Sequence, residues 1–193
     1  MRKCFCGSDK HTTIVNIPLA SFADCVLQPN IHVVQCDSCG FTFNQTCDTQ
    51  LIYDSYYSTQ NDYFVKSNPP GSDLVAVISK HTPRDGSLLD VGCGGGQLIT
   101  RLKEDGMRVT GLDTSRVCAD SLNAKGIPCI HGSVFTTPID DQWDVVACCH
   151  VLEHIIDLQY FVSKLATLVK PSGKLYIEVP DSERYTASTP FQD

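Results

Sequence analysis

The chain has 193 residues, a length that suits one globular domain with a small additional module. It carries 15 lysines and arginines against 22 aspartates and glutamates, and its formal net charge of −7 argues against nucleic acid as a partner. The composition, 42% hydrophobic and 19% charged residues, is that of a folded protein, and no stretch reaches the roughly 18–20 apolar residues of a membrane helix, so we expect no membrane partner either.

The cysteines separate the start of the chain from the rest. There are 11 of them, an odd number, and the N-terminus lacks the apolar stretch of an export signal. Both observations argue against a disulfide framework and favour a cytoplasmic location. The cysteines after residue 90 lie in apolar or glycine-rich surroundings, where cysteine serves as a small buried residue. Six cysteines lie within residues 1–50: Cys4, Cys6, Cys25, Cys36, Cys39 and Cys47.

Two cysteine pairs in this region predict a structural zinc site. Cys36-Asp37-Ser38-Cys39-Gly40 is a knuckle that presents two thiolates to one tetrahedral metal, and Cys4-Phe5-Cys6-Gly7 offers a second pair with a shorter spacer. We therefore expect zinc to be bound by Cys4, Cys6, Cys36 and Cys39. An alternative is a small β-rich cap whose cysteines stay reduced without metal. Four further residues are substitute ligands or bystanders: His11, Cys25, His32 and Cys47.

The chain divides into three predicted regions. Residues 1–50 form the cysteine-rich, zinc-binding module. Residues 51–71 form a tyrosine-rich connecting segment, with Tyr56-Tyr57 and Tyr63-Phe64, that ends in the breaker Asn68-Pro69-Pro70-Gly71. Its aromatic residues either cover a ligand as a lid or pack between the modules. Residues 72–193 form the main domain.

The main domain alternates between strands and helices. Ser72 begins a helix with Leu74, Val77 and Ile78 on its apolar face. Later helices are expected from Leu98 to about Gly106, from Ser115 to about Gly126, and around residues 161–168. Strands alternating with such helices predict an α/β fold with a doubly wound, mainly parallel sheet. The expected strands are residues 88–91, 108–112, 127–130, 143–148 and 174–179.

The most specific motif is the glycine-rich turn Asp90-Val91-Gly92-Cys93-Gly94-Gly95-Gly96, between an expected strand and an expected helix. Glycines at such a turn let the backbone approach a ligand closely. A dinucleotide fingerprint would need glycine at position 97, which is Gln97, so an NAD-dependent dehydrogenase is disfavoured. Asp90 before the turn and Asp113 at the end of the next strand favour a ligand with a cationic amino-acid end and a nucleoside end.

S-adenosylmethionine fits that description, and residues from about 85 to 181 resemble the class I S-adenosylmethionine-dependent methyltransferases. Leu88–Leu98 resembles the first motif of that family, and Gly111-Leu112-Asp113 resembles the second. Trp143-Asp144-Val145-Val146, followed by His150-Val151-Leu152-Glu153-His154, resembles the fourth-strand motif. The resemblance implies a Rossmann-like core that binds S-adenosylmethionine.

Roles for the glycine turn follow from this resemblance. Gly92, Gly94 and Gly96 would line the methionine portion of the cofactor, and Asp90 would hold its amino group. Cys93 belongs to the same cofactor-binding turn. We expect it to pack as a small residue, as often in this family, rather than to act as a nucleophile.

The resemblance also places the other end of the cofactor and the reacting methyl group. Asp113 would bind the ribose hydroxyls, with Thr114 beside it in the cofactor site. Ser133 and Val134 would flank the adenine, where the family frequently has an aspartate. His150 follows the fourth strand, where the transferring methyl should point, and is both a cofactor-site residue and the candidate catalytic base. The residues just after it, Glu153 and His154, are expected to cap and pack the following loop.

The order of cysteine module, tyrosine segment and methyltransferase core is similar to a bacterial group that includes sugar C-methyltransferases and other enzymes of polysaccharide or antibiotic biosynthesis. This resemblance implies a small-molecule acceptor, with a sugar or nucleotide-sugar favoured. The alternative is a non-catalytic module that uses the zinc knuckle for protein contacts, or an inactive fragment of a longer methyltransferase.

The end of the chain carries a further expectation. The class I fold usually continues after its fifth strand with a helix and an antiparallel strand pair, whereas this chain ends about a dozen residues after that strand, at Asp193. We therefore expect a C-terminally incomplete core. Its exposed sheet edge would invite pairing with a second copy as a homodimer.

Overall fold

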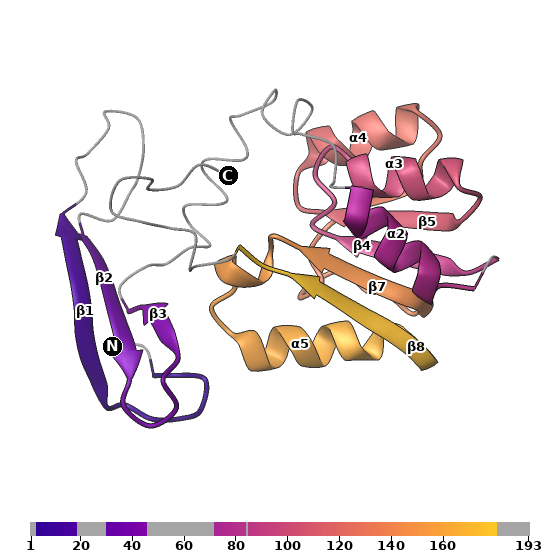
Figure 1. Cartoon of the computed structure of the whole chain (residues 1–193). Helices are drawn as coiled ribbons and strands as arrows, with labels where there is room; N and C mark the ends of the chain where they lie inside the picture. Colours follow the sequence, from indigo (N-terminus) through magenta and orange to yellow (C-terminus); the bar gives the residue numbers. More distant parts are fainter. Residues whose placement is uncertain (1–2, 19–29, 46–71, 84, 181–193) are drawn as a thin grey trace. The chain divides into compact units, whose positions relative to one another are not determined.

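A computed structural model of the protein describes residues 3–18, 30–45, 72–83 and 85–180 (Figure 1). The whole predicted tyrosine-rich segment, together with Cys25, Cys47 and residues 181–193, lies outside these ranges. The expected limits of the three regions at residues 50 and 71 also lie outside them and stay predictions. None of the helices in the described ranges combines the length and apolar character needed to cross a bilayer.

The N-terminal part is a three-stranded antiparallel sheet in the order β1-β2-β3. Its small core includes Val34 of β2 and Phe43 of β3, which are buried together with Cys4 and Cys36. Apolar and polar residues do not alternate along β1 as they do in a strand with one buried face. The side chains at positions 12–16 are all exposed, so neither face of this stretch has to be apolar. The strands are β1 (His11–Pro18), β2 (Asn30–Cys36) and β3 (Thr42–Asn44).

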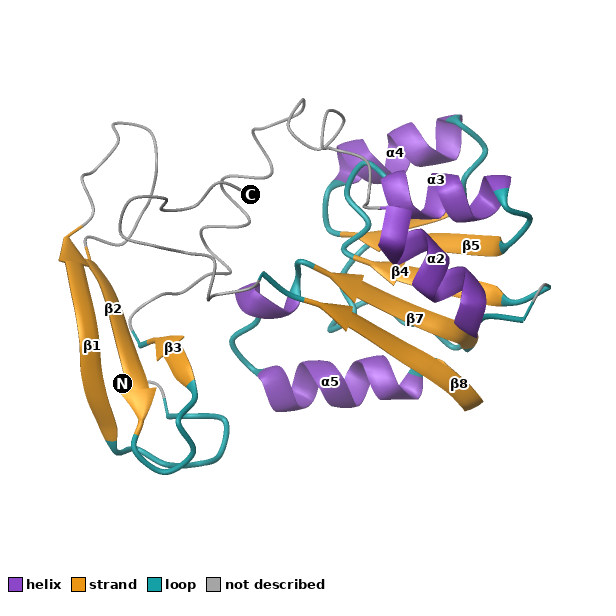
Figure 2. Ribbon diagram, in the orientation of Figure 1, coloured by secondary structure: helices purple, strands orange, loops and turns teal. Residues whose placement is uncertain are grey.

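The C-terminal part contains a five-stranded parallel sheet in the order β6-β5-β4-β7-β8, which confirms the predicted fold class (Figure 2). The central strand β4 is almost fully buried, with Leu88 and Leu89 inaccessible to solvent. The strands are β4 (Ser87–Val91), β5 (Arg108–Asp113), β6 (Cys129–His131), β7 (Trp143–Cys149) and β8 (Val169–Glu178).

Helices connect these strands. Because the strand order reverses between β4 and β7, right-handed crossovers place the helices of the two halves on opposite faces of the sheet. Ile99, Leu102 and Leu122 are buried on the face that α3 and α4 cover. The helices are α2 (Ser72–His81), α3 (Gln97–Glu104), α4 (Arg116–Ala124) and α5 (Leu158–Thr167), with a 3₁₀ turn, η2, at Leu152–His154.

Two sequence expectations are corrected by the structure. Val77 of α2 is 43% exposed, so the buried side of this helix is formed by Leu74 and Ile78, with Val75 packed beside them. The last strand begins at Val169, not at residue 174, and includes Pro171-Ser172-Gly173. These residues form a bulge, because the register against β7 shifts there and Ser172 has φ 68°.

Candidate functional site

The glycine turn joins β4 to α3 at the carboxyl end of the sheet. Gly92, Gly94 and Gly96 have φ of 75°, 51° and 76°, a region that other residues rarely adopt. Gly92 also donates to the carbonyl of Leu112 at 2.8 Å, which ties the turn to β5. A Cβ at Gly96 would lie 2.3 Å from a methyl carbon of Leu122, so the turn also needs glycine for its close approach to α4. The motif thus forms a glycine turn at the carboxyl end of the sheet, where doubly wound sheets bind ligands.

Asp90 lies directly before this turn, in the last part of β4. Its side chain is only 4% exposed, and no group within the described ranges donates a hydrogen bond to its carboxylate. Burial, and then the negative charge of Asp113, raise its pKa to about 7. A buried carboxylate without a donor is costly unless a cation satisfies it. Asp90 therefore suits the amino group of a bound ligand.

Asp113 ends β5 and is held by the backbone. Its two carboxylate oxygens accept hydrogen bonds from the N–H groups of Gly94 at 2.8 Å and Ser115 at 2.7 Å. Burial raises the pKa of Asp113, and these two N–H groups act against that rise. Because a carboxylate offers about four acceptor positions, two remain for the hydroxyls of a ribose.

The residues expected beside the ribose and the adenine lie on the neighbouring loops. Thr114 is exposed, and its carbonyl oxygen lies 3.1 Å from Nε2 of His131. Ser133 follows β6, and its hydroxyl accepts a hydrogen bond from the N–H of Phe135 at 3.2 Å. Val134 is 8% exposed. The turn after β6 thus offers an apolar side chain and a hydroxyl already engaged with its own backbone, and the adenine role of these residues stays a prediction.

Cys93 is part of the hydrophobic core. It is 7% exposed, and its Sγ lies 3.6 Å from Sγ of Cys129. The contact with Cys129 and burial both raise the pKa of its thiol, which leaves it a neutral group at neutral pH. This environment fits the expected packing role and does not suit a nucleophile.

His150 lies just after β7 and is half exposed. Its ring contacts two carboxylates, at 3.2 Å from Nε2 to Oε1 of Glu178 and at 3.8 Å from Nδ1 to Oε1 of Glu153. The backbone at His150 has φ 55°, which is uncommon for a residue other than glycine. Sequence reasoning missed Glu178 and its neighbour Tyr176, although their spacing of two on an expected strand already placed both on one side of it.

The four predicted zinc ligands come together in the N-terminal part. The Sγ atoms of Cys4, Cys6, Cys36 and Cys39 all lie within 4.8 Å of one another. The Cys4–Cys39 and Cys6–Cys36 pairs are separated by 3.5 and 3.6 Å. Four thiolates around one zinc at about 2.3 Å would be about 3.8 Å apart, so this spacing fits the metal.

The short spacer of the first pair is accommodated by the turns that carry the cysteines. Gly7 donates to the carbonyl of Cys4 at 2.8 Å, and Gly40 donates to that of Cys36 at 2.9 Å. Burial disfavours the thiolate of Cys36, but N–H groups of Cys39 and Ser38 outweigh it and lower its pKa to about 6. The turn around Cys36 thus favours the thiolate of this residue, the form that binds metal, whereas burial raises the pKa of Cys4 to about 12.

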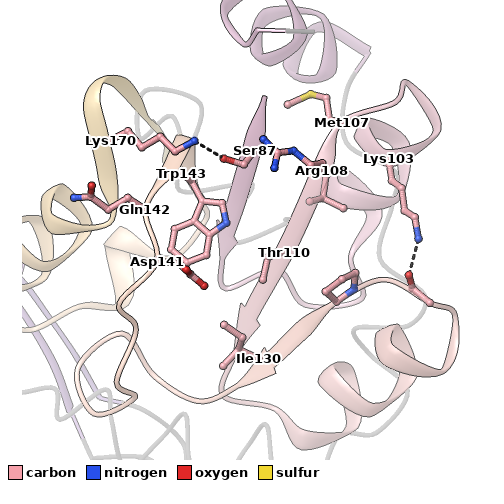
Figure 3. Close-up of a pocket in the computed structure, with 13 residues that line it drawn as sticks. Ser87, Lys103, Met107, Arg108, Thr110, Ile130, Asp141, Gln142, Trp143 and Lys170 are labelled. Atoms are coloured by element: carbon pink, nitrogen blue, oxygen red, sulfur yellow. Dashed lines mark hydrogen bonds between the residues drawn. The ribbon is translucent and has the colours of Figure 1, made fainter. Parts of the chain in front are cut away.

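A cavity of about 610 Å³ lies at the opposite, amino ends of the strands (Figure 3). Three positively charged side chains line this cavity. However, Lys103 donates to a backbone carbonyl, Arg108 donates to the carbonyl of Asp85, and Lys170 pairs with Asp144 at 3.0 Å. Because each cation is held by an acceptor of the protein itself, this cavity is not assigned a ligand.

Comparisons with known proteins agree with this geometry. Residues 60–193 match a family described as methyltransferase domain. Ubiquinone biosynthesis O-methyltransferase of Rickettsia bellii (strain OSU 85-389) is 35% identical over 96 residues, which cover 46% of this chain and 40% of that protein. The protein of the same name from Coxiella burnetii (strain Dugway 5J108-111) is 36% identical over 98 residues, covering 46% and 41%. The matches thus span about two fifths of the length of these relatives.

Solved structures share the fold. The DhpI–SAM–HEP complex aligns with a TM-score of 0.55 and 26% identity, covering 70% of this chain and 67% of that one. DesVI of Streptomyces venezuelae aligns with a TM-score of 0.50 and 21% identity, covering 72% and 61%. Because the matched residues 60–193 make up more than half of the chain and contain the whole five-stranded sheet with its glycine turn, this chain belongs to the methyltransferase-domain family, the class I S-adenosylmethionine-dependent methyltransferases.

Proposed function

We propose that this protein transfers a methyl group from S-adenosylmethionine to a small-molecule acceptor. The observation that carries the proposal is Asp90, a buried carboxylate without a hydrogen-bond donor in the described ranges, placed beside a glycine turn. When bound, S-adenosylmethionine supplies a methyl group activated by the positive charge of its sulfonium. Asp90 would accept its ammonium group, and Asp113 would accept the ribose hydroxyls.

For the acceptor group we favour a hydroxyl. Relatives that are 35% and 36% identical over about half of this chain carry the name ubiquinone biosynthesis O-methyltransferase. The sugar or nucleotide-sugar acceptor rests only on the order of modules in the sequence and stays a prediction. The same holds for the cytoplasmic location and for the expected lack of a nucleic-acid partner.

We infer that the N-terminal part binds one structural zinc ion through Cys4, Cys6, Cys36 and Cys39. All four thiols converge, and each pair lies on a turn closed by a glycine. A site filled by four cysteine ligands leaves no open position for a substrate. The metal therefore stabilises the small sheet and takes no part in methyl transfer.

Thermal unfolding with added ligands tests the cofactor. S-adenosylhomocysteine at about 100 times its dissociation constant should stabilise the protein by about 2.7 kcal/mol, whereas NAD at the same concentration should leave the midpoint unchanged. The substitution Asp113→Asn should weaken the shift without changing the sheet. Stabilisation by NAD alone, or by neither compound, would contradict the proposed cofactor.

A further inference from the structure

Three side chains at the carboxyl ends of β7 and β8 form a continuous hydrogen-bonded line. Nε2 of His150 lies 3.2 Å from Oε1 of Glu178. The other carboxylate oxygen of Glu178 accepts a hydrogen bond from the hydroxyl of Tyr176 at 2.9 Å. The N–H of His150 also donates to the carbonyl of Glu178 at 2.9 Å. Both the ring and the backbone of His150 are thus fixed against β8.

The residue that follows His150 lies against the glycine turn. The residue after His150 is Val151, and a Cβ at Gly92 would lie 2.3 Å from one of its methyl carbons. The loop that carries His150 therefore packs directly on the part of the turn assigned to the methionine portion of the cofactor. The side chain of His150 remains 52% exposed, so an acceptor can reach its ring.

The environment of the ring decides which nitrogen can accept a proton. An ionised Glu178 can only accept a hydrogen bond, so Nε2 carries the proton of the neutral ring and Nδ1 keeps its lone pair, as in other sites where a carboxylate orients a basic histidine. Nδ1 lies 3.8 Å from Oε1 of Glu153, which is too far for a hydrogen bond. The positive φ of His150, 55°, is a strained conformation of the kind found at functional sites.

We propose that Glu178 and Tyr176 are positioning residues that hold His150 as a general base, with Nδ1 directed to an acidic hydroxyl of the acceptor. This inference rests on the proposed function. The acceptor oxygen bonds to the methyl carbon while the carbon–sulfur bond breaks, and the electron pair of that bond stays on the sulfur. The hydroxyl proton passes to Nδ1, and the resulting imidazolium lies between Glu178 and Glu153.

The chemistry of the base indicates the class of acceptor. Proton transfer to an imidazole has a larger driving force when the hydroxyl is more acidic, so phenols, catechols and enols suit this base better than an ordinary sugar alcohol does. An aromatic or enolic hydroxyl is therefore the acceptor class that we favour for this site. If the three side chains had a purely structural role and only joined the ends of β7 and β8, the tautomer and the turnover of the variants would respond differently.

The first experiment observes the ring directly and needs no acceptor. Nitrogen-15 NMR of the full chain should show the neutral His150 ring protonated at Nε2. In Glu178→Gln the carboxamide can donate to Nε2, so the Nδ1–H form should become populated. Tyr176→Phe should leave the Nε2–H form dominant. His131, whose Nε2 lies 3.1 Å from the carbonyl of Thr114, is an internal control that should not change. An unchanged His150 tautomer in Glu178→Gln would overturn the positioning role.

The second experiment measures methyl transfer to a series of substituted phenols of decreasing acidity. His150→Gln should lower kcat roughly 10²–10⁴-fold for the weakly acidic phenols and much less for phenols that are already ionised at the assay pH. Glu178→Gln should follow the same trend with a smaller loss. Glu104→Gln, at an exposed pair with Arg101, is the matched control and should keep full activity.

Binding of S-adenosylhomocysteine distinguishes a failure of the proposed function from a failure of the proposed general base. If the wild-type protein fails to bind it, the proposed function is wrong. If all variants bind it equally but His150→Gln keeps full turnover, the general base is wrong. If the wild type binds it and methylates no phenol of the series, the acceptor class is overturned.

Discussion

Two aspartates in adjacent strands of the five-stranded sheet have opposite electrostatic environments. Asp144 of β7 accepts hydrogen bonds from the N–H and hydroxyl of Ser87 at 2.8 and 2.9 Å, and it pairs with Lys170 at 3.0 Å. The N–H of Ser87 and the ammonium of Lys170 lower its pKa to about 2. Asp90 of β4 has no such partners in the described ranges, and burial raises its pKa to about 7. Asp144 thus stabilises the fold, whereas Asp90 is suited to a cationic ligand.

The substitution Asp90→Asn should therefore stabilise the ligand-free protein and abolish the shift produced by S-adenosylhomocysteine. The pKa of Asp90 is about 7 in the folded protein and has its ordinary value in the unfolded chain. Above pH 7, Asp90 therefore lowers the free energy of unfolding by on the order of 2–4 kcal/mol. The gain from Asn should grow as the pH rises from about 4 to about 7 and stay constant above. Urea unfolding at a series of pH values measures it.

Asp144→Asn is the matched control, and its effect should have the opposite sign. Because the pKa of Asp144 is depressed when folded, its stabilisation is present above the ordinary aspartate range and is lost as the pH falls toward 2. The variant should be less stable than wild type at pH 7 and should still bind S-adenosylhomocysteine. Equal pH profiles for the two variants would refute this division of roles.

At the scale of elements, the turns around the cysteines determine whether β1, β2 and β3 stay folded. Their shared core is small and includes Cys4 and Cys36 themselves. So small an apolar cluster needs additional stabilisation, which four thiolates on one metal would supply. The N-terminal sheet is therefore expected to depend on zinc more than the five-stranded sheet does.

Cys36→Ser should purify without stoichiometric zinc and lose the structure of the N-terminal strands. Elemental analysis gives the metal content, and amide hydrogen exchange shows which strands lose protection. Cys118→Ala, which removes a buried thiol of α4 outside the cluster, should retain one zinc per chain. The cofactor shift should survive in both variants. Wild-type protein free of zinc would disprove the metal site.

The alternation of strands and helices was predictable because the apolar residues in the C-terminal part are spaced as in buried strands or in helices with one buried face. Leu88–Val91 reads as a buried strand because its side chains pack on both faces, and Gly96 and Gly106 lie beside the ends of α3 as expected. The N-terminal strands were missed because β1 is exposed on both sides. The start of β8 was misplaced because a bulge tolerates Pro171 and Gly173 inside a strand.

The glycine turn and the position of His150 were predictable from the sequence, whereas the hydrogen-bond partners of His150 were not. Asp90, the glycines and Asp113 lie in two short motifs, each local in the sequence. The partners of His150 come from β8, 26 and 28 residues later, and only the pairing of β7 with β8 brings them together. Contacts between distant segments leave no pattern in a single sequence, so Glu178 and Tyr176 required the structure.

At the scale of the whole molecule, the described sheet ends in an edge. Strand β8 pairs with β7 on one side, and no other strand in the described ranges pairs with it. Ile177, near the end of β8, and Val179, just after it, are 37% and 47% exposed. An open edge with exposed apolar residues is a template for pairing with another chain. We propose that a second copy of this chain occupies it.

Sedimentation of the protein over a concentration series tests this homodimer. The wild type should pass from monomer to dimer as its concentration rises, and Ile177→Lys should shift that transition to higher concentration because a charge must then be buried beside a second strand. Val162→Lys, at an exposed apolar position of α5, is the control for added charge and should dimerise as the wild type does. A stable monomer of the wild type at every concentration would exclude pairing through β8. Since His150 contacts Glu178 on this same strand, dimerisation should also slow amide exchange at both residues, a change that association through another surface would not produce.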